Sequence, residues 1–124
     1  MNLFFKELKL VNTIEGAIKE LEKQIDISPK LYEIIDFIIE AHEGQFRKSG
    51  EPYSVHPILV ATITSTFSKD EDVIATALLH DVVEDTPFTL EFVEEKWGKN
   101  VSNMVKGLTK VADIREENFI TSKD

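Results

Sequence analysis

The chain has 124 residues, the length of a single ordinary domain, and 42% of them are hydrophobic, as in globular proteins with a sizeable core. Lys and Arg number 14 against 23 Asp and Glu, and the net charge of −9 argues against a broad basic face for nucleic acid or an anionic membrane. Because the chain has no cysteine, disulfides, thiolate zinc sites and cysteine nucleophiles are excluded.

Apolar residues recur at helical spacing along most of the chain, and the glycines and prolines lie at the junctions between these stretches. The first predicted helix covers residues 13–25. Ser28 followed by Pro29 is typical of an N-cap and the first helical position, and predicts a helix that continues to about Phe46. Residues 47–53 are polar and contain glycine and proline, which predicts a loop.

The second half of the chain also reads as helices. A helix is predicted over 56–63, and another over 73–83, which is apolar on nearly every side and therefore belongs in the centre of a bundle. A short helix over 89–97 should stop at Gly98, and a last helix should run from about 100 to 111. No alternating strand pattern occurs, so the predicted fold class is all-α, an irregular helical bundle of about five or six helices.

Nothing in the sequence predicts a membrane span or export. No stretch approaches the roughly 20 apolar residues that a membrane-spanning helix requires. The first six residues lack the basic region and long apolar core of a signal peptide. Together with the absence of cysteine, this favours a cytoplasmic protein.

Four polar residues gather at the end of the predicted central helix. His80 and Asp81 are neighbours, and Glu84 and Asp85 follow one helical turn after each of them. Three adjacent carboxylates would repel one another and lose hydration if buried, and a divalent cation would remove that cost. Imidazole with carboxylate suits manganese, iron or zinc better than calcium. The alternative is that the helix ends here and its acids point into water.

His56 and the loop before it could approach the same patch. A lone histidine before proline is more often a capping or packing residue than a metal ligand. Arg47 and Lys48 could clamp phosphate oxygens, and arginine could offer a plane on which a base stacks, although adjacent cations on a loop are usually solvated surface. We interpret His42, one turn before the loop, as structural or as support for its neighbours.

Several motifs occur together in one order and spacing. They are HEGQFRKSGEPY at 42–53, HP at 56–57, ALLHDVVEDT at 77–86 and GLTK at 107–110. This combined signature closely resembles the hydrolase domain of RelA/SpoT-type proteins, which belong to the HD-domain metal-dependent phosphohydrolases. The resemblance covers about residues 30–111 and is far more specific than an isolated His-Asp pair.

The resemblance implies an all-helical fold and hydrolysis of (p)ppGpp at the ribose 3′ position, with GDP or GTP and pyrophosphate as products and Mn²⁺ or another divalent metal as cofactor. By the same resemblance, the metal ligands include His56, His80 and Asp81. Glu84 and Asp85 correspond to the family's acidic pair beside the attacking water and the leaving group. A divalent ion would activate that water and offset charge on the diphosphate.

The resemblance also assigns the guanine nucleotide to four residues of the loop: Arg47, Lys48, Ser49 and Tyr53. In the family a fourth metal ligand, an aspartate, comes on a later helix, beyond the last residue of this sequence, and Asp113 lies too early to replace it. We therefore expect residues 1–124 to form one HD-type hydrolase domain that is incomplete at its C-terminus, with weakened metal binding. The surface left by the truncation could support a homodimer.

Three other interpretations stay open. The chain could be an HD phosphohydrolase for another nucleotide, although Arg47 and Lys48 belong to the (p)ppGpp branch by resemblance. It could be a silent regulatory module of a bifunctional GTP pyrophosphokinase, or (p)ppGpp synthetase, although its His-Asp pair and acidic pair are both intact. A helical scaffold without a site would leave the joint placement of these residues unexplained.

Overall fold

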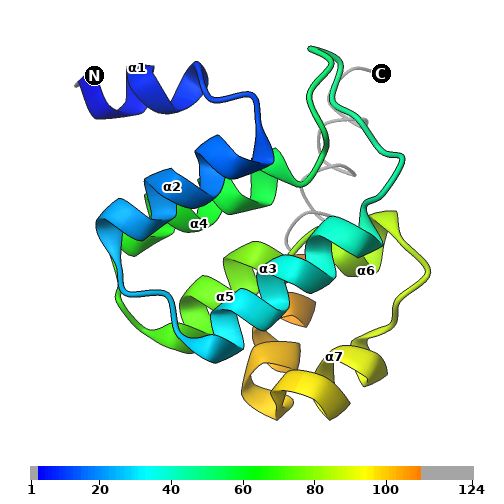
Figure 1. Cartoon of the computed structure of the whole chain (residues 1–124). Helices are drawn as coiled ribbons and strands as arrows, with labels where there is room; N and C mark the ends of the chain where they lie inside the picture. Colours follow the sequence, from blue (N-terminus) through cyan, green and yellow to red (C-terminus); the bar gives the residue numbers. More distant parts are fainter. Residues whose placement is uncertain (1–2, 110–124) are drawn as a thin grey trace, which may run out of the picture.

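The computed structural model describes residues 3–109 of the chain. Residues 99–109 are helical, and before them come seven labelled helices (Figure 1): α1 (Leu3–Lys9), α2 (Ile14–Gln24), α3 (Pro29–Ala41), α4 (Val55–Ser65), α5 (Glu71–Leu79), α6 (Val82–Asp85) and α7 (Leu90–Trp97). The only strand-like pairing within the described range is one isolated bridge between Phe46 and Pro52. The predicted all-α class is confirmed. Lys110 and Asp113 lie outside the described residues.

The predicted starts of α3 and α7 are set by side-chain caps, and the predicted stop of α7 is set by a glycine. Ser28 accepts a hydrogen bond from the Leu31 amide at 3.2 Å at the start of α3, and Thr89 accepts one from the Phe92 amide at 3.1 Å at the start of α7. Gly98 ends α7 with a φ of 100°, a left-handed conformation that suits glycine. Local sequence therefore determines these boundaries.

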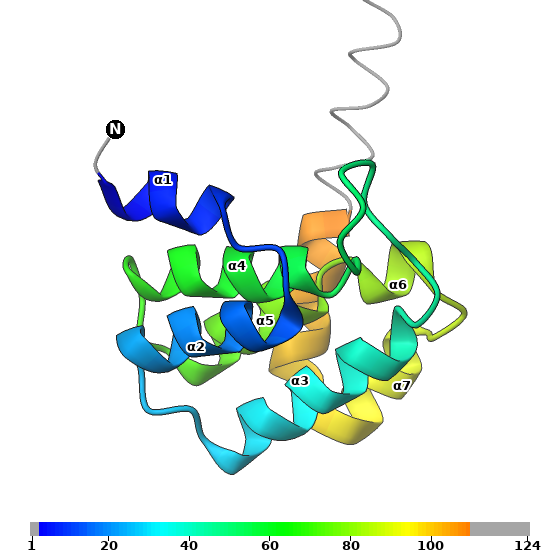
Figure 2. The same cartoon turned by 45° about the horizontal axis from the view of Figure 1, so that its top comes forward.

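The core forms where α4 and α5 pack together, with α2 against α4 and α3 against α5 (Figure 2). Every residue of α5 from Ile74 to Leu79 is buried, as the apolar pattern of this segment predicts. Leu21 of α2, Ile38 of α3 and Ile58 of α4 belong to the same core and have no exposed surface. The central helix is thus rigidly placed, and its C-terminal end carries His80.

The predicted helix over 73–83 is wrong in one respect, because the chain turns at His80 and Asp81 and then begins α6. The His80 ring nitrogen Nδ1 lies 2.6 Å from the backbone oxygen of Ala77. In a continuous α-helix that carbonyl would accept the amide of Asp81, so the imidazole competes with the helix for it. The break changes the direction in which the two site residues project.

Two other boundaries differ from the sequence prediction. The helix α3 ends at Ala41 rather than near Phe46, because Gly44 adopts a φ of 82° that an α-helix does not allow. The helix α1 was not predicted, and its seven residues bury Leu8 with 3% exposure. The described residues therefore form more helices than the five or six predicted, because α1 is added and the predicted central helix is divided into α5 and α6.

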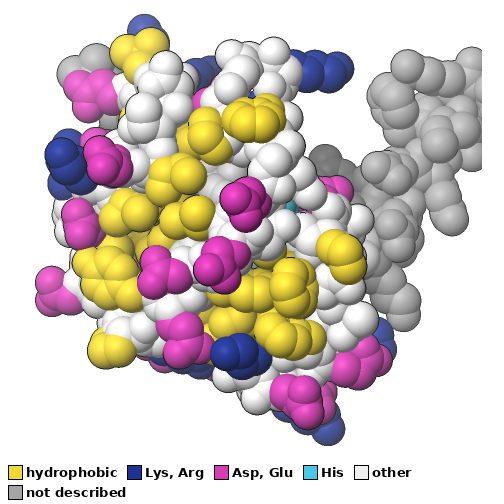
Figure 3. All heavy atoms as spheres, turned by 45° about the vertical axis from the view of Figure 1, so that its right-hand side comes forward, with side chains coloured by type: hydrophobic (Ala, Val, Ile, Leu, Met, Phe, Trp, Pro, Cys, Tyr) yellow, Lys and Arg dark blue, Asp and Glu magenta, His cyan; other side chains and the backbone are white. Residues whose placement is uncertain are grey.

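The surface agrees with the negative net charge. On the face shown in Figure 3, acidic side chains lie among separate hydrophobic patches, and Lys and Arg form no continuous area. None of the helices in the described part of the chain combines the length and apolar character needed to cross a membrane.

Candidate metal centre

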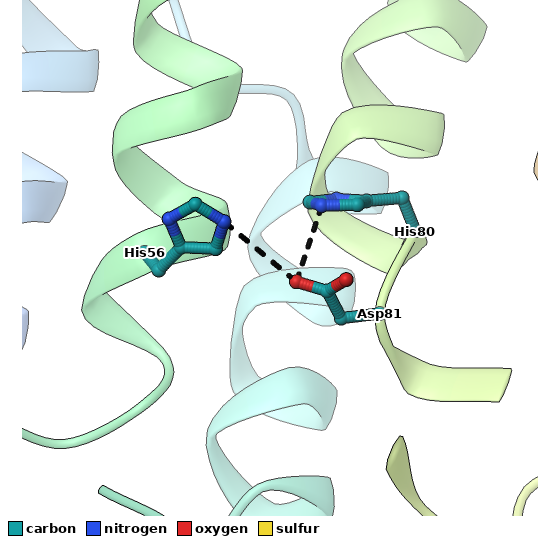
Figure 4. A group of neighbouring side chains, drawn as sticks. All are labelled: His56, His80 and Asp81. Atoms are coloured by element: carbon teal, nitrogen blue, oxygen red, sulfur yellow. Dashed lines mark ion pairs between the residues drawn. The ribbon is translucent and has the colours of Figure 1, made fainter. Parts of the chain in front are cut away.

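Three side chains from three elements meet at the C-terminal end of α5 (Figure 4). His56 lies in the first turn of α4, His80 directly follows α5, and Asp81 directly precedes α6. Each offers one ligand atom, and these atoms all lie within 4.8 Å of one another. The structure therefore brings together the three residues predicted as metal ligands.

The carboxylate lies between the two rings. Asp81 Oδ2 is 3.1 Å from His80 Nε2 and 3.8 Å from His56 Nε2, and the ring centroids are 5.9 Å apart. Asp81 is buried, whereas the two histidines keep part of their surface exposed. The group is thus fixed on the protein side and open toward solvent, as a site that exchanges substrate needs to be.

The tautomer of His80 follows from its backbone contact. A carbonyl oxygen can only accept, so the 2.6 Å contact with Ala77 requires His80 Nδ1 to donate its proton. In the neutral ring this leaves the lone pair on Nε2, the atom that faces Asp81, and only the protonated ring donates a hydrogen bond from Nε2 to Asp81. Metal-binding histidines commonly have their second nitrogen held in this way by a carbonyl or carboxylate.

Tyr53 fixes the orientation of the carboxylate. Its hydroxyl donates to Asp81 Oδ2 at 2.8 Å, in addition to the contacts of that oxygen with the histidines. Burial and this hydrogen bond raise the pKa of Tyr53 above its usual range, so the phenol stays a donor. Tyr53, predicted as a nucleotide-binding residue, therefore also holds a candidate metal ligand.

The surroundings of the site keep Asp81 ionised between the two imidazole rings. Burial raises the pKa of Asp81, but the hydrogen bond and charge of His80 outweigh it, and the net pKa lies below the usual value. Burial lowers the pKa of His56, and the nearby charge of Arg47 lowers it further. Burial also lowers the pKa of His80, but its hydrogen bonds to Asp81 and Ala77 outweigh this and give a net increase. A divalent cation would compete with the proton that Asp81 and His80 otherwise share.

The loop before α4 forms a small hairpin. The Arg47 backbone amide donates to the Glu51 backbone oxygen at 2.9 Å, and the Tyr53 backbone amide donates to the Gln45 backbone oxygen at 2.9 Å. Gly50 occupies the tip with a φ of 103°, which favours glycine. This geometry sets Arg47 and Lys48 on the same hairpin arm, directly before the tip.

A pocket of about 390 Å³ adjoins His56, one of the three candidate ligands. Its lining consists of hairpin residues and the first-turn histidine of α4: Phe46, Arg47, Lys48, Ser49, Tyr53 and His56. All four predicted nucleotide-binding residues therefore face one space, and His56 belongs to both the pocket and the ligand group. Phe46, which is not among the predicted site residues, is 64% exposed there.

The acidic pair lies beside this group rather than in it. Glu84 and Asp85 are exposed on α6 and are not among the three residues whose ligand atoms converge. Their charges still act on the site, because Glu84 raises the pKa of His80 and Asp85 raises that of Tyr53. Their predicted catalytic roles stay predictions.

The chain thus forms an all-helical bundle in which a His-Asp pair follows a buried helix and a second histidine faces that pair. The sequence of residues 35–124 matches a family model described as "HD domain". The chain therefore belongs to the HD-domain family.

Individual relatives confirm the resemblance to RelA/SpoT-type proteins. The chain is 47% identical over 76 residues to a guanosine-3′,5′-bis(diphosphate) 3′-pyrophosphohydrolase of Haemophilus influenzae. The matched segment covers 61% of this chain and 11% of that protein. It is 46% identical over 76 residues to the bifunctional (p)ppGpp synthase/hydrolase SpoT of Escherichia coli, with the same coverage. A 3′-pyrophosphohydrolase of Aquifex aeolicus is 40% identical over 109 residues, 88% of this chain and 15% of that protein. The chain thus spans a small part of the length of these relatives.

Proposed function

We propose that this chain belongs to a (p)ppGpp 3′-pyrophosphohydrolase and holds a Mn²⁺ ion at His56, His80 and Asp81. The observation that carries the proposal is the convergence of these three ligand atoms beside a pocket that Arg47 and Lys48 line. The names of the relatives support the substrate class, since both a 3′-pyrophosphohydrolase and a bifunctional (p)ppGpp synthase/hydrolase match this chain. We place residues 1–124 within one HD-type domain in the cytoplasm.

The donor set fits a divalent transition metal. Two imidazole nitrogens and one carboxylate oxygen suit Mn²⁺, Fe²⁺ or Zn²⁺, and both His80 and Asp81 are held by further hydrogen bonds. When bound, such an ion supplies positive charge to a phosphoryl group and favours formation of the nucleophile from water. The remaining steps fall to the side chains of the chain itself.

The hairpin cations suit a polyphosphorylated nucleotide. A chain with a net charge of −9 repels such a ligand at long range, so local cations are needed where it binds. Arg47 and Lys48 provide them at the pocket, while the exposed ring of Phe46 and the guanidinium of Arg47 offer planes for a base. We infer that this hairpin orients the nucleotide toward the ligand group.

The acidic pair fits the proton transfer of the reaction. Water attacks the phosphorus bound to the ribose 3′ oxygen, the P–O3′ bond breaks, and a proton from water reaches the 3′ oxygen as pyrophosphate leaves. We assign this proton transfer to Glu84 or Asp85, which are exposed beside the ligand group on α6. Tyr53 keeps Asp81 oriented during the step through its 2.8 Å hydrogen bond.

The proposal is tested by pyrophosphate release from ppGpp, with and without Mn²⁺, together with calorimetric titration of Mn²⁺. We expect Mn²⁺-dependent release and a saturable Mn²⁺ heat that Asp81→Asn abolishes. Release from another nucleotide but not from ppGpp would replace the substrate, and the absence of both release and Mn²⁺ binding would refute the proposal. Dimerisation, expected from the sequence, stays a prediction that size-exclusion chromatography with light scattering checks.

A further inference from the structure

His42 is a buried histidine with an unusual set of contacts. It follows α3, has 2% of its surface exposed, and places its ring nitrogen Nδ1 2.9 Å from Gln45 Oε1. Its other ring nitrogen, Nε2, is the one buried side-chain nitrogen or oxygen in the described part of the chain without a hydrogen-bond partner.

The contacts of Gln45 determine the tautomer. The amide nitrogen of Gln45 donates to the backbone oxygen of Asp85 at 2.8 Å, so Oε1 is the acceptor that faces His42. A carbonyl oxygen only accepts, and the proton of the neutral ring therefore lies on His42 Nδ1. The result is a directed chain of hydrogen bonds from His42 through Gln45 to Asp85.

This chain of hydrogen bonds joins segments 40 residues apart in the sequence. Figures 1 and 2 both show the loop between α3 and α4 running beside α6. Gln45 connects this loop to the residue at which α6 ends. It therefore restrains the turn that carries the acidic pair, whose own side chains are exposed.

Packing alone does not account for a histidine at this position. A buried acceptor without a partner is destabilising, and an apolar side chain of similar size would avoid that cost. The feature that an apolar residue could not supply is the Nδ1–H donor to Gln45. Buried polar atoms without a hydrogen-bond partner are expected mainly at functional sites, where the function offsets their cost in stability.

We propose that His42, acting through Gln45, is a positioning residue for the acidic turn of α6 in the hydrolysis proposed above. The inference rests on that proposed function for its role in catalysis, but its structural part does not. The pair holds the Asp85 carbonyl in place and thereby sets where Glu84 and Asp85 lie relative to His80 and Asp81. Loss of the pair should affect the chemical step rather than ligand binding.

Three variants and a control of the full chain test the proposal. His42→Leu and Gln45→Leu remove the directed bonds, whereas His42→Asn keeps an N–H donor near the position of Nδ1. Ser54→Ala is the matched control, because Ser54 is equally buried and contacts the Ile38 backbone oxygen at 3.4 Å without reaching α6.

The first measurement does not depend on activity. Long-range ¹H–¹⁵N spectra should show the His42 proton on Nδ1 in the unmodified chain. Amide hydrogen exchange at Asp85 and Thr86 should become faster in Gln45→Leu and His42→Leu, and remain unchanged in Ser54→Ala. A proton on Nε2, or unchanged exchange in Gln45→Leu, would overturn the proposal. Gln45→Leu decides this point even where His42→Leu does not fold, because Gln45 lies in a loop and is only half-buried.

The second measurement separates kcat from KM with ppGpp and Mn²⁺. Both leucine variants should lose about tenfold in kcat, the usual effect of removing an outer partner of a site, with KM and Mn²⁺ affinity unchanged. His42→Asn should recover most of the loss. Equal losses in His42→Asn and His42→Leu, or the same loss in Ser54→Ala, would show a merely structural role. If the unmodified chain releases no pyrophosphate, the proposed function fails, while the exchange data still decide whether His42 and Gln45 hold the turn.

Discussion

The candidate metal ligands lie at the ends of buried helices, whereas the candidate nucleotide-binding residues lie on an exposed hairpin. His56 is flanked by the buried Val55 and Pro57, and His80 follows a helix whose last six residues are all buried. On the hairpin, Lys48 and Ser49 are exposed, and backbone hydrogen bonds close the loop. Packing sets the positions of the ligands before anything binds, while the hairpin can adjust to a nucleotide.

This difference separates two kinds of effect. Interiors are close-packed, so a ligand group built on them keeps its geometry and selects a cation by donor type and spacing. Exposed loops keep more freedom and carry binding residues that meet varied parts of a ligand. Substitutions in the first region should therefore reduce metal affinity, and so should Tyr53→Phe, because Tyr53 contacts Asp81. Substitutions at Arg47, Lys48 or Ser49 of the hairpin should reduce nucleotide affinity alone.

The largest effect is expected from Asp81→Asn, on the affinity for Mn²⁺. This substitution keeps the size of the side chain but removes the charge that faces both histidines. Changes at outer partners of metal ligands cost 10–100-fold in affinity, so loss of a ligand charge should cost at least about 100-fold for Mn²⁺. Calorimetric titration measures this, and near-normal Mn²⁺ binding by Asp81→Asn would remove the ligand group from the proposal.

A smaller effect is expected for Tyr53→Phe, which removes only the hydroxyl that donates to Asp81. Mn²⁺ affinity should fall by about tenfold because the carboxylate loses its fixed orientation. Tyr32→Phe is the matched control, since the Tyr32 hydroxyl donates to Glu22, away from the site. An equal change in both variants would mean that Tyr53 does not act through Asp81.

Arg47→Ala tests the other region. Removing one charged contact to a nucleotide should weaken binding of ppGpp by about tenfold, the lower end of the effect expected from the roughly 1.5–3 kcal/mol of a hydrogen bond to a charged group. Mn²⁺ affinity should not fall, because Arg47 is not among the three residues whose ligand atoms converge and its positive charge repels a cation bound beside it. Lys69→Ala, at a lysine that contacts the Gln24 backbone, controls for net charge. Equal loss of metal and nucleotide binding would contradict the separation of the two regions.

Some features of the fold and the site depend on residues close together in the sequence, and these can be predicted from it. Others depend on contacts between distant segments, and these cannot. Ser28, Thr89 and Gly98 determine helix ends through contacts with near neighbours, and these boundaries were correctly predicted. The break after Leu79 was missed because an apolar run carries no sign that a side chain will take a backbone carbonyl. The link from Gln45 to Asp85 was missed because its two ends meet only in the folded chain.

The smallest effect is expected at the tip of the hairpin, in Gly50→Ala. No atom lies within 4 Å of an added Cβ, so the cost comes only from the backbone φ of 103°, about 1 kcal/mol for a residue with a side chain. Gly107→Ala is the matched control, because an added Cβ there also meets open space but lies in a helical segment, where alanine should stabilise the fold by about 0.4–1 kcal/mol. The midpoint temperature of thermal unfolding should therefore fall in Gly50→Ala and rise in Gly107→Ala.

Gly50→Ala should also weaken ppGpp binding by less than Arg47→Ala does, because the hairpin can relax, and should leave Mn²⁺ affinity unchanged. A loss of Mn²⁺ binding in Gly50→Ala would show that the hairpin and the ligand group form one rigid unit.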